Sequence, residues 1–296
     1  MARARVEISH PDRVLFPADG ITKGDLADYY GAVAGAMLPH LRGRALTVQR
    51  FPRGIGEPGF VQQDFADSLP AWMGRVEVAK AGGTVVHPLA ERPEALRWLV
   101  NQDCITLHAW QSRRGRLNNP DRLVFDLDPF DGDFAVVRAT ARAVAGVLED
   151  LGLIGYVQTT GSRGLHVVVP VRADTDFGTA RQFTRDLADV VAADDPAHRT
   201  VEVRKDRRGG RLYLDVMRNA YAQTAVAPYS VRPLARAPVA TPLEWEELDT
   251  RGLRANRFTV RDLPKRLAEQ RDPWAGMSRH ARSLSGPCER LAKLRA

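Results

Sequence analysis

Two apolar segments joined by a tight turn restrict the fold more than any other feature of this 296-residue chain. Residues 156–160 and 165–171 are rich in β-branched side chains, and Gly161 and Gly164 lie in the turn between them. This pattern predicts an antiparallel hairpin. A second hairpin is expected at residues 201–204 and 212–217. Because an all-parallel sheet contains no hairpins, the sequence predicts an α+β fold with a mostly antiparallel central sheet and flanking helices.

The other predicted elements do not alternate regularly, and we find no internal repeat. Apolar periodicity predicts helices at residues 25–38, 91–103, 134–151, 177–192 and 260–270. It predicts further strands at residues 45–51, 76–79, 105–110 and 123–128. From about residue 272 onward, partial disorder is expected.

The strand predicted at residues 123–128 ends in a pair of aspartates. Residues i and i+2 of a strand point to the same face, so Asp126 and Asp128 would aim both carboxylates at one point. Such carboxylates repel each other unless a cation lies between them, and Mg²⁺ and Mn²⁺ prefer oxygen ligands. A lone Asp-x-Asp before proline is more often a solvated turn, however. A metal site therefore needs support from other parts of the chain.

Three further segments could place polar side chains on the same sheet face. Asp215 lies in a predicted apolar strand, where an unpaired acid is costly. Ser162 and His166 belong to the glycine-containing turn, whose backbone N–H groups could hold a phosphate. His108 lies in the strand before the aspartate pair. Taken alone, the turn is more often an ordinary tight hairpin and His108 a structural residue, and a single strand aspartate such as Asp215 often faces solvent.

The net charge of +7 is concentrated near the C-terminus. Residues 251–296 hold 12 Lys or Arg and 4 Asp or Glu, whereas the first 250 residues are nearly neutral. Within that neutral part, residues 204–211 form a basic loop that includes Lys205, Arg207 and Arg208. The loop suits phosphate contacts, and a solvated loop explains it about equally well.

Cysteine usage and hydropathy exclude several classes of protein. Cys104 and Cys288 are far apart and lie outside any zinc-binding spacing, so neither a zinc site nor a disulfide framework is expected. No apolar run is long enough to cross a membrane, and the N-terminus lacks the apolar core of a signal peptide. These features predict a cytoplasmic protein.

A series of short motifs occurs in order along nearly the whole chain. It comprises DRVLFP (12–17), ITKGD (21–25), LPH (38–40), RFP (50–52), NQDCI (101–105), FDLDP (125–129), GSRGLH (161–166), DVMRN (215–219), APYSVR (227–232) and TPLEW (241–245). Together these motifs resemble the polymerase domain of bacterial ligase D, a member of the archaeo-eukaryotic primase superfamily used in non-homologous end joining.

The resemblance implies a role for each candidate residue at the catalytic centre. Asp126, Asp128 and Asp215 match a metal-binding triad that would hold two Mn²⁺ or Mg²⁺ ions for phosphoryl transfer. The positions that match a triphosphate site are Ser162, His166, Arg218 and Arg232, with His108 near the nucleotide.

The resemblance also implies contacts to DNA. Arg13 and Lys23 match a pocket for the 5′-phosphate of the downstream strand, and Phe60 could stack on a template base. The family usually carries a second aromatic residue and a lysine just after that phenylalanine. Here those places are Val61 and Gln63, a departure that affects this part of the DNA contact.

The expected function is a primase-polymerase nucleotidyltransferase. It would add ribo- or deoxyribonucleotides to a primer 3′-hydroxyl at short gaps or broken DNA ends with a 5′-phosphate. Residues 1–272 would form the catalytic domain, with residues 1–100 contributing DNA-end contacts and residues 273–296 forming a basic extension. The family implies a Ku-like partner, and a stand-alone polymerase would need a separate ligase. We expect the protein to be associated with the nucleoid.

Two alternatives remain open from the sequence. A non-catalytic DNA-end-binding module would need only Arg13, Lys23 and the basic loop. A phosphohydrolase would use Asp126 as a nucleophile, although Pro129 stands where such enzymes usually have a polar residue. Product identity separates the enzymes, because polymerisation releases pyrophosphate and lengthens a primer.

Overall fold

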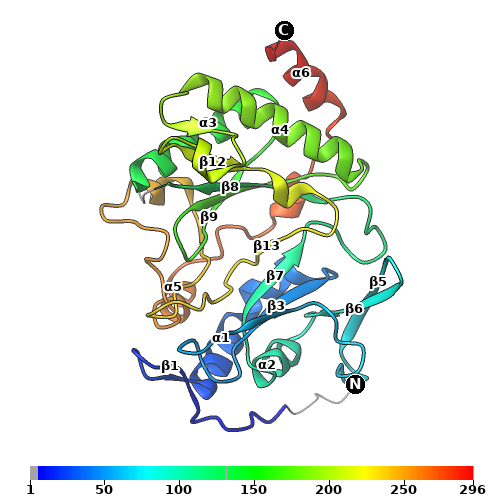
Figure 1. Cartoon of the computed structure of the whole chain (residues 1–296), viewed down its shortest axis with the longest axis vertical. Helices are drawn as coiled ribbons and strands as arrows, with labels where there is room; N and C mark the ends of the chain where they lie inside the picture. The colour runs from blue at the N-terminus through cyan, green and yellow to red at the C-terminus, as the bar shows by residue number, and fades with distance from the viewer. Residues whose placement is uncertain (1–5, 131–132, 296) are drawn as a thin grey trace.

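The chain folds into two lobes, each built on its own β-sheet (Figure 1). The computed structural model describes residues 6–130 and 133–295. The lower lobe in Figure 1, built mostly from the N-terminal half of the chain, carries one hydrophobic core, and the upper lobe carries a second. This mixed architecture, with mainly antiparallel strand pairs, confirms the predicted α+β fold.

The lower lobe in Figure 1 contains a four-stranded sheet in the order β13-β7-β3-β4. Its strands are β3 (Leu46–Arg50), β4 (Phe60–Gln62), β7 (Cys104–Trp110) and β13 (Thr224–Val226). Beside it lie the pairs β1 (Val14–Phe16) with β2 (Ile21–Thr22), and β5 (Gly74–Lys80) with β6 (Gly83–Leu89). The helices of this lobe are α1 (Lys23–Leu41), α2 (Pro93–Asn101) and α5 (Leu263–Glu269).

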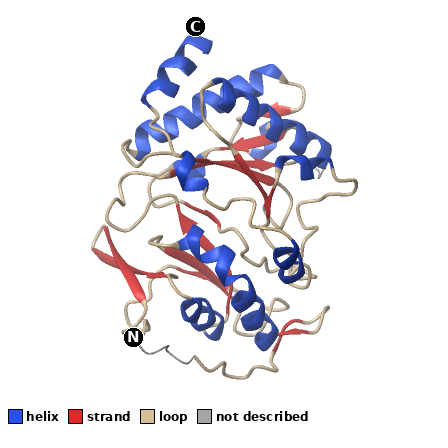
Figure 2. Cartoon of the chain, turned by 180° about the vertical axis from the view of Figure 1, so that it is seen from behind, coloured by secondary structure: helices blue, strands red, loops and turns tan. Residues whose placement is uncertain are grey.

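The upper lobe contains a six-stranded sheet in the order β11-β12-β8-β10-β9-β14. Its strands are β8 (Arg122–Asp128), β9 (Tyr156–Thr159), β10 (Leu165–Pro170), β11 (Arg199–Thr200), β12 (Leu212–Asp215) and β14 (Pro242–Leu243). Helices α3 (Phe134–Asp150), α4 (Phe177–Asp194) and α6 (Ser285–Arg295) lie on its outer side (Figure 2). Short 3₁₀ turns occur at Lys205–Arg207, Met217–Asn219, Trp245–Asp249 and Met277–His280.

Alternation along the strands turns the polar faces of both sheets toward the space between the lobes. On β8, Leu123, Phe125 and Leu127 enter the core with α3 and α4, so Asp126 and Asp128 face the other way. On β7, Leu107 belongs to the core with α1 and α2, whereas its neighbour His108 lines a cavity between the sheets. The predicted site therefore lies between two helix-backed sheets.

Local sequence signals set the ends of the main helices. Thr22 caps α1 by accepting a hydrogen bond from the Asp25 backbone N–H at 3.1 Å, while the Asp25 carboxylate accepts from the Thr22 backbone N–H at 2.8 Å. The side chains of Asp133 and Asp176 cap α3 and α4 by accepting hydrogen bonds from the backbone N–H groups of Ala135 and Thr179. The predicted helices at these places are confirmed, with small shifts of their bounds.

One predicted hairpin is confirmed and the other is wrong. β9 and β10 pair antiparallel around the predicted turn. Residues 201–204, by contrast, form no strand, and the preceding β11 pairs parallel with β12. The basic loop is thus a crossover that returns the chain to the start of β12. Side-chain hydrogen bonds from Arg208 to the carbonyl oxygens of Glu202 and Val203 hold the loop instead of strand pairing.

The C-terminal segment is folded, so the expected partial disorder is wrong for the described residues 272–295. Trp274 is 1% exposed and packs with Val124, Val168 and Ala225 on the inner side of the upper sheet. Its indole N–H donates to the Val157 carbonyl oxygen at 3.1 Å. Leu291 of α6 enters the outer core. Packing of these apolar side chains outweighs the basic composition of the segment.

Candidate active site

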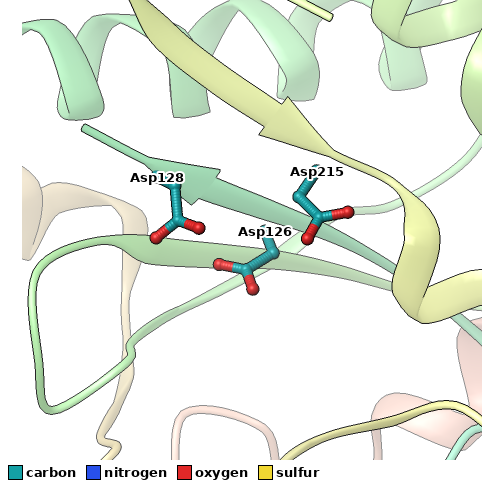
Figure 3. A group of neighbouring side chains, drawn as sticks. All are labelled: Asp126, Asp128 and Asp215. Atoms are coloured by element: carbon teal, nitrogen blue, oxygen red, sulfur yellow. The ribbon is translucent and has the colours of Figure 1, made fainter. Parts of the chain in front are cut away.

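The three predicted metal ligands meet on adjacent strands of the upper sheet (Figure 3). Asp126 and Asp215 are direct cross-strand partners on β8 and β12, and Asp128 follows two residues along β8. One carboxylate oxygen from each residue lies within 4.8 Å of the others. The strand period predicted the Asp126/Asp128 pair, and the register of β12 adds the third ligand.

The surrounding charges distinguish Asp126 from its two neighbours. Its carboxylate lies 3.3 Å from the Nε2 atom of His166 and 3.3 Å from the Nε atom of Arg218. Burial acts to raise the pKa of Asp126, but these two groups outweigh it and hold the pKa below its ordinary value. Burial, followed by repulsion from Asp126, raises the pKa of Asp128.

Asp215 has a mixed environment. Its carboxylate accepts a hydrogen bond from the Met217 backbone N–H at 2.7 Å, yet burial raises its pKa above the ordinary value and Asp126 adds to the effect. Negative charge at the three aspartates is therefore only partly compensated. An all-oxygen donor set with residual negative charge fits hard divalent cations such as Mg²⁺ or Mn²⁺.

A cavity beside the triad collects every residue predicted to bind the nucleotide. Its lining includes Asp126 and Asp128 together with His108, Ser162, His166, Arg218 and Arg232. The cavity lies between the sheets, since His108 comes from β7 and His166 from β10. Thr224, Ala225 and Val226 of β13 close the side of the lower lobe.

The turn between β9 and β10 is held in place by glycine geometry. Gly161 has φ of +68°, and a Cβ atom there would clash with the Arg232 side chain and with Val239 and Ala240. A Cβ atom at Gly164 would overlap the Leu127 carbonyl oxygen on β8. The turn can therefore lie directly against the strand that carries the aspartates. Arg232 also donates to the Thr160 carbonyl oxygen at 3.1 Å, which ties its guanidinium to this turn.

His108 is held neutral at the back of the cavity. Its Nε2 atom is buried, with no hydrogen-bond partner in the described part of the chain. Burial, then the nearby charges of Arg232 and Arg218, lower its pKa to about 3. A neutral imidazole with a free ring nitrogen is available for a ligand that enters the cavity.

Two residues that support the site were not predicted from the sequence. Gln158 lies opposite His166 in the β9–β10 pair, and its amide nitrogen lies 3.2 Å from the His166 Nδ1 atom. Asn219 bonds both backbone groups of Val124, at 2.8 and 2.7 Å, and so fixes the turn that presents Arg218. Asn219 lies inside the DVMRN motif, but its partners on β8 are about ninety residues away along the chain, so no local signal revealed this role.

The two residues predicted for the 5′-phosphate lie together in the lower lobe, away from the triad. Both contact Asp103: Arg13 through a short ion pair, and Lys23 at 3.0 Å. The Lys23 ammonium also donates to the Asn101 carbonyl oxygen at 2.8 Å, and the residue is 1% exposed. Arg13 is the more accessible of the pair, at 33%. Their contact with a DNA phosphate stays a prediction.

The remaining predicted DNA contacts lie on the surface. Phe60 of β4 is 48% exposed, with the Arg50 guanidinium 5.3 Å from its ring centroid. In the basic loop, Lys205 lies over Phe130, and the Arg208 guanidinium lies 3.9 Å from the ring centroid of Tyr213, the cross-strand partner of Asp128. Arg207 lies in the same loop, facing the groove beside α4.

A triad of carboxylates beside an arginine- and histidine-lined cavity, carried on an antiparallel sheet, defines the class of protein. It is a metal-dependent nucleotidyltransferase of the primase-polymerase type, and the three carboxylates form a group that could hold divalent metal ions.

Comparison with known proteins gives the family. The profile described as "LigD, primase-polymerase domain" matches residues 22–274, so the chain belongs to the LigD primase-polymerase domain family. The multifunctional non-homologous end joining DNA repair protein LigD of Mycobacterium tuberculosis is 37% identical over 277 residues, which cover 90% of this chain and 36% of that protein. The LigD protein of Pseudomonas aeruginosa is 32% identical over 300 residues, covering 98% of this chain and 35% of that protein.

A solved structure agrees with this assignment. The polymerase domain of Mycobacterium tuberculosis ligase D, in complex with DNA, superposes with a TM-score of 0.87 at 34% identity, over 94% of this chain and 99% of that one. The chain spans about a third of the length of these LigD relatives. Among the described residues, no helix is long and apolar enough to span a membrane.

Proposed function

We propose that this protein extends a DNA primer at short gaps or broken ends, using ribo- or deoxyribonucleoside triphosphates. The observation that supports this most strongly is the cavity beside the aspartate triad, where Asp126 and Asp128 meet Ser162, His166, Arg218 and Arg232. The triad suits metal-assisted chemistry, and the cationic side suits a triphosphate.

The residues divide the work in a physically consistent way. Asp126, Asp128 and Asp215 would hold two Mn²⁺ or Mg²⁺ ions, which supply charge neutralisation and acidify the attacking 3′-hydroxyl. Arg218 and Arg232 would grip phosphate oxygens with their planar guanidinium groups.

The smaller polar groups would complete the nucleotide site. Ser162 would donate its hydroxyl from the glycine turn, and neutral His108 would contact the nucleotide from the opposite sheet. His166, whose Nε2 atom lies 3.3 Å from the Asp126 carboxylate, would orient that carboxylate and contact a phosphate group in the cavity that it lines.

The repair setting follows from the named relatives, which are non-homologous end joining proteins. We propose the same setting here, with a Ku-like protein at the DNA end and a ligase that seals the product. Arg13 and Lys23 would recognise the downstream 5′-phosphate, while Phe60, Lys205, Arg207 and Arg208 would contact the DNA strands.

Primer extension on a gapped DNA tests the proposal. The assay would compare Mn²⁺ with Mg²⁺, rNTPs with dNTPs, and a downstream strand with or without its 5′-phosphate. Extension that needs metal and Asp128, and that improves with the 5′-phosphate, is the expected result. Release of inorganic phosphate through a covalent aspartyl-phosphate would favour the phosphohydrolase. DNA binding without any chemistry would favour the end-binding module.

A further inference from the structure

Arginines from four separate segments meet at one end of the region between the lobes. We call them the arginine patch: Arg42, Arg113, Arg116, Arg172 and Arg282. Arg113 donates to the Arg42 carbonyl oxygen at 2.6 Å, and the Arg172 backbone N–H donates to the Arg282 carbonyl oxygen at 2.9 Å. Arg116 donates to the Ala173 carbonyl oxygen at 3.0 Å. These bonds hold the segments together as one surface.

Two members of the patch line an open groove on the surface, and Arg172 and Arg282 follow directly after two other residues that line it. Arg42, Arg113, Asp121 and Val171 line it, and Ser278 and Ala281 of the C-terminal segment form its far wall. The groove therefore lies between the basic C-terminal region and the arginines that follow α1 and β7.

Positive charge exceeds negative charge at this place. Asp121 is shared by Arg113, at 2.6 Å, and the buried Arg44, at 2.5 Å. Behind them Arg122 is 4% exposed, and its Nε atom has no hydrogen-bond partner among the described residues. Burial, then repulsion from Arg44, lowers the pKa of Arg122, and Asp121 only partly opposes this effect.

The exposed members of the patch are free to bind. Arg42 and Arg172 are exposed and form no ion pair with any residue in 6–130 or 133–295. Within the described part of the chain, the Arg282 side chain donates only to the neighbouring Ala281 carbonyl oxygen. Several guanidinium groups spread along an open groove match a polymer of phosphodiesters better than a small anion, which would need an enclosed pocket.

Two strands fix the position of the patch relative to the active site. Arg122, which lies behind the patch, is the first residue of β8, so along this strand it lies about 13 Å from Asp126 and about 20 Å from Asp128. β7 runs from the neighbourhood of Asp103, which holds Arg13 and Lys23, to the segment that carries Arg113. The patch and the proposed 5′-phosphate pocket therefore lie toward opposite ends of β7, with His108 between them.

We propose that the arginine patch binds the sugar–phosphate backbone of the primer–template duplex, about six base pairs behind the reacting end. The inference rests on the proposed function, because DNA is taken as the substrate. The downstream strand would be held at one end of the cleft and the upstream duplex at the other, so that the 3′-hydroxyl is presented at the triad.

Binding of two hairpin DNAs tests the patch. Their upstream stems would have roughly 4 or roughly 12 base pairs, the shorter ending before the patch and the longer crossing it. The variant Arg42→Ala/Arg172→Ala/Arg282→Ala should bind the long stem about tenfold more weakly than the unchanged protein at low salt. Its slope of log affinity against log salt should fall by about 0.9 for each phosphate that the variant no longer neutralises. Both proteins should bind the short stem alike.

A matched control removes three charges elsewhere. Arg251→Ala/Arg254→Ala/Lys293→Ala alters exposed residues with no side-chain bond in the described chain, and should leave both affinities unchanged. Equal affinity and equal salt slope of the patch variant and the unchanged protein on the long stem would overturn the inference, and so would an equal loss in the control. Nucleotide addition to the short stem, measured in parallel, tests the proposed function separately, because that stem does not reach the patch.

Discussion

Asp128, one of the three proposed metal ligands, lowers the stability of the folded protein when no metal is bound. Burial and the adjacent Asp126 raise its pKa, so its ionised form is unfavourable in the folded protein above that pKa. We expect Asp128→Asn to lower metal-dependent primer extension by two to three orders of magnitude or more. At neutral pH the same change should raise the melting temperature of the metal-free protein.

Thermal melts with and without Mn²⁺ check this prediction. Added metal should stabilise the unchanged protein more than Asp128→Asn, because only the former keeps all three ligands. Asp67→Asn, at an exposed position with no side-chain partner among the described residues, is the control and should change neither property. A metal-free Asp128→Asn protein that melts lower than the unchanged protein would contradict the repulsion argument.

Asn219 supports the site without facing the substrate. Asn219→Ala would leave the buried backbone groups of Val124 without partners, at a cost of about 1–3 kcal/mol in unfolding free energy. We also expect a higher KM for the nucleotide, because the turn that carries Arg218 loosens. Denaturant unfolding and steady-state kinetics would measure both effects, with the exposed Gln223→Ala as control. A stability loss with an unchanged KM would show that Arg218 is positioned independently of Asn219.

Residue-scale prediction succeeded where one strand carried the signal and failed where the partner lay on another element. The two-residue period of β8 sufficed to pair Asp126 with Asp128. Asn219 and Gln158 act through hydrogen bonds to residues of β8 and β10. These bonds depend on how the strands and turns are arranged in the fold, and the sequence around each residue does not reveal that arrangement. The family resemblance supplied the site residues, whereas the supporting contacts came only from the fold.

At the scale of the element, the turn between β9 and β10 determines how closely Ser162 and its neighbours approach the aspartates. We expect Gly164→Ala to push the turn away from β8, because its Cβ atom would overlap the Leu127 carbonyl oxygen. Stability should fall by about 1–3 kcal/mol, and primer extension should fall with it. Gly31→Ala is the matched control: it lies within α1 with no atom near the added Cβ, so it should stabilise the protein by up to about 1 kcal/mol. Equal melting temperatures for both variants would rule out the close approach.

The same scale explains the misplaced hairpin. Val201 and Val203 alternate with polar residues as a strand would, and residues 212–217 follow after a glycine-containing loop, so local pattern favoured a hairpin. β11 instead follows α4 and enters the sheet edge parallel to β12, whereas the predicted hairpin would need an antiparallel strand there. Helices and the β9–β10 hairpin were predictable because their signals are local, whereas the parallel edge strand depends on tertiary packing.

At the scale of the whole molecule, the C-terminal segment joins the lobes. Asp272 accepts hydrogen bonds from His40 of α1 at 2.8 Å and from the Tyr229 hydroxyl at 2.6 Å. Two residues later, Trp274 is buried against the upper sheet. From the sequence we expected a basic and partly disordered extension after residue 272, because the apolar residues that anchor it are few and widely spaced. We therefore expect truncation after Asp272 to destabilise the whole protein instead of only weakening its hold on DNA.

Asp272 gives this expectation a pH dependence. Burial alone would raise its pKa, but the hydrogen bonds from His40 and Tyr229 prevail and lower it. A carboxylate with a depressed folded-state pKa stabilises the protein above its unfolded pKa of about 3.9, and that stabilisation is lost as pH falls through the folded value. At pH 7, Asp272→Asn should thus lower the free energy of unfolding by about 1–3 kcal/mol and lower the melting temperature with it. The difference should shrink below roughly pH 4.

Trp274 separates packing from charge in the same segment. Trp274→Ala should cost about 3–5 kcal/mol at every pH, whereas Trp274→Phe should recover most of that loss because a ring still fills the space between the sheets. Both lobes should unfold in one transition if the segment couples them. A Trp274→Ala protein that melts in two separate steps would instead show that the lobes are stable on their own. In that case the active site, whose cavity is lined by residues of both sheets, would depend on a contact other than this segment.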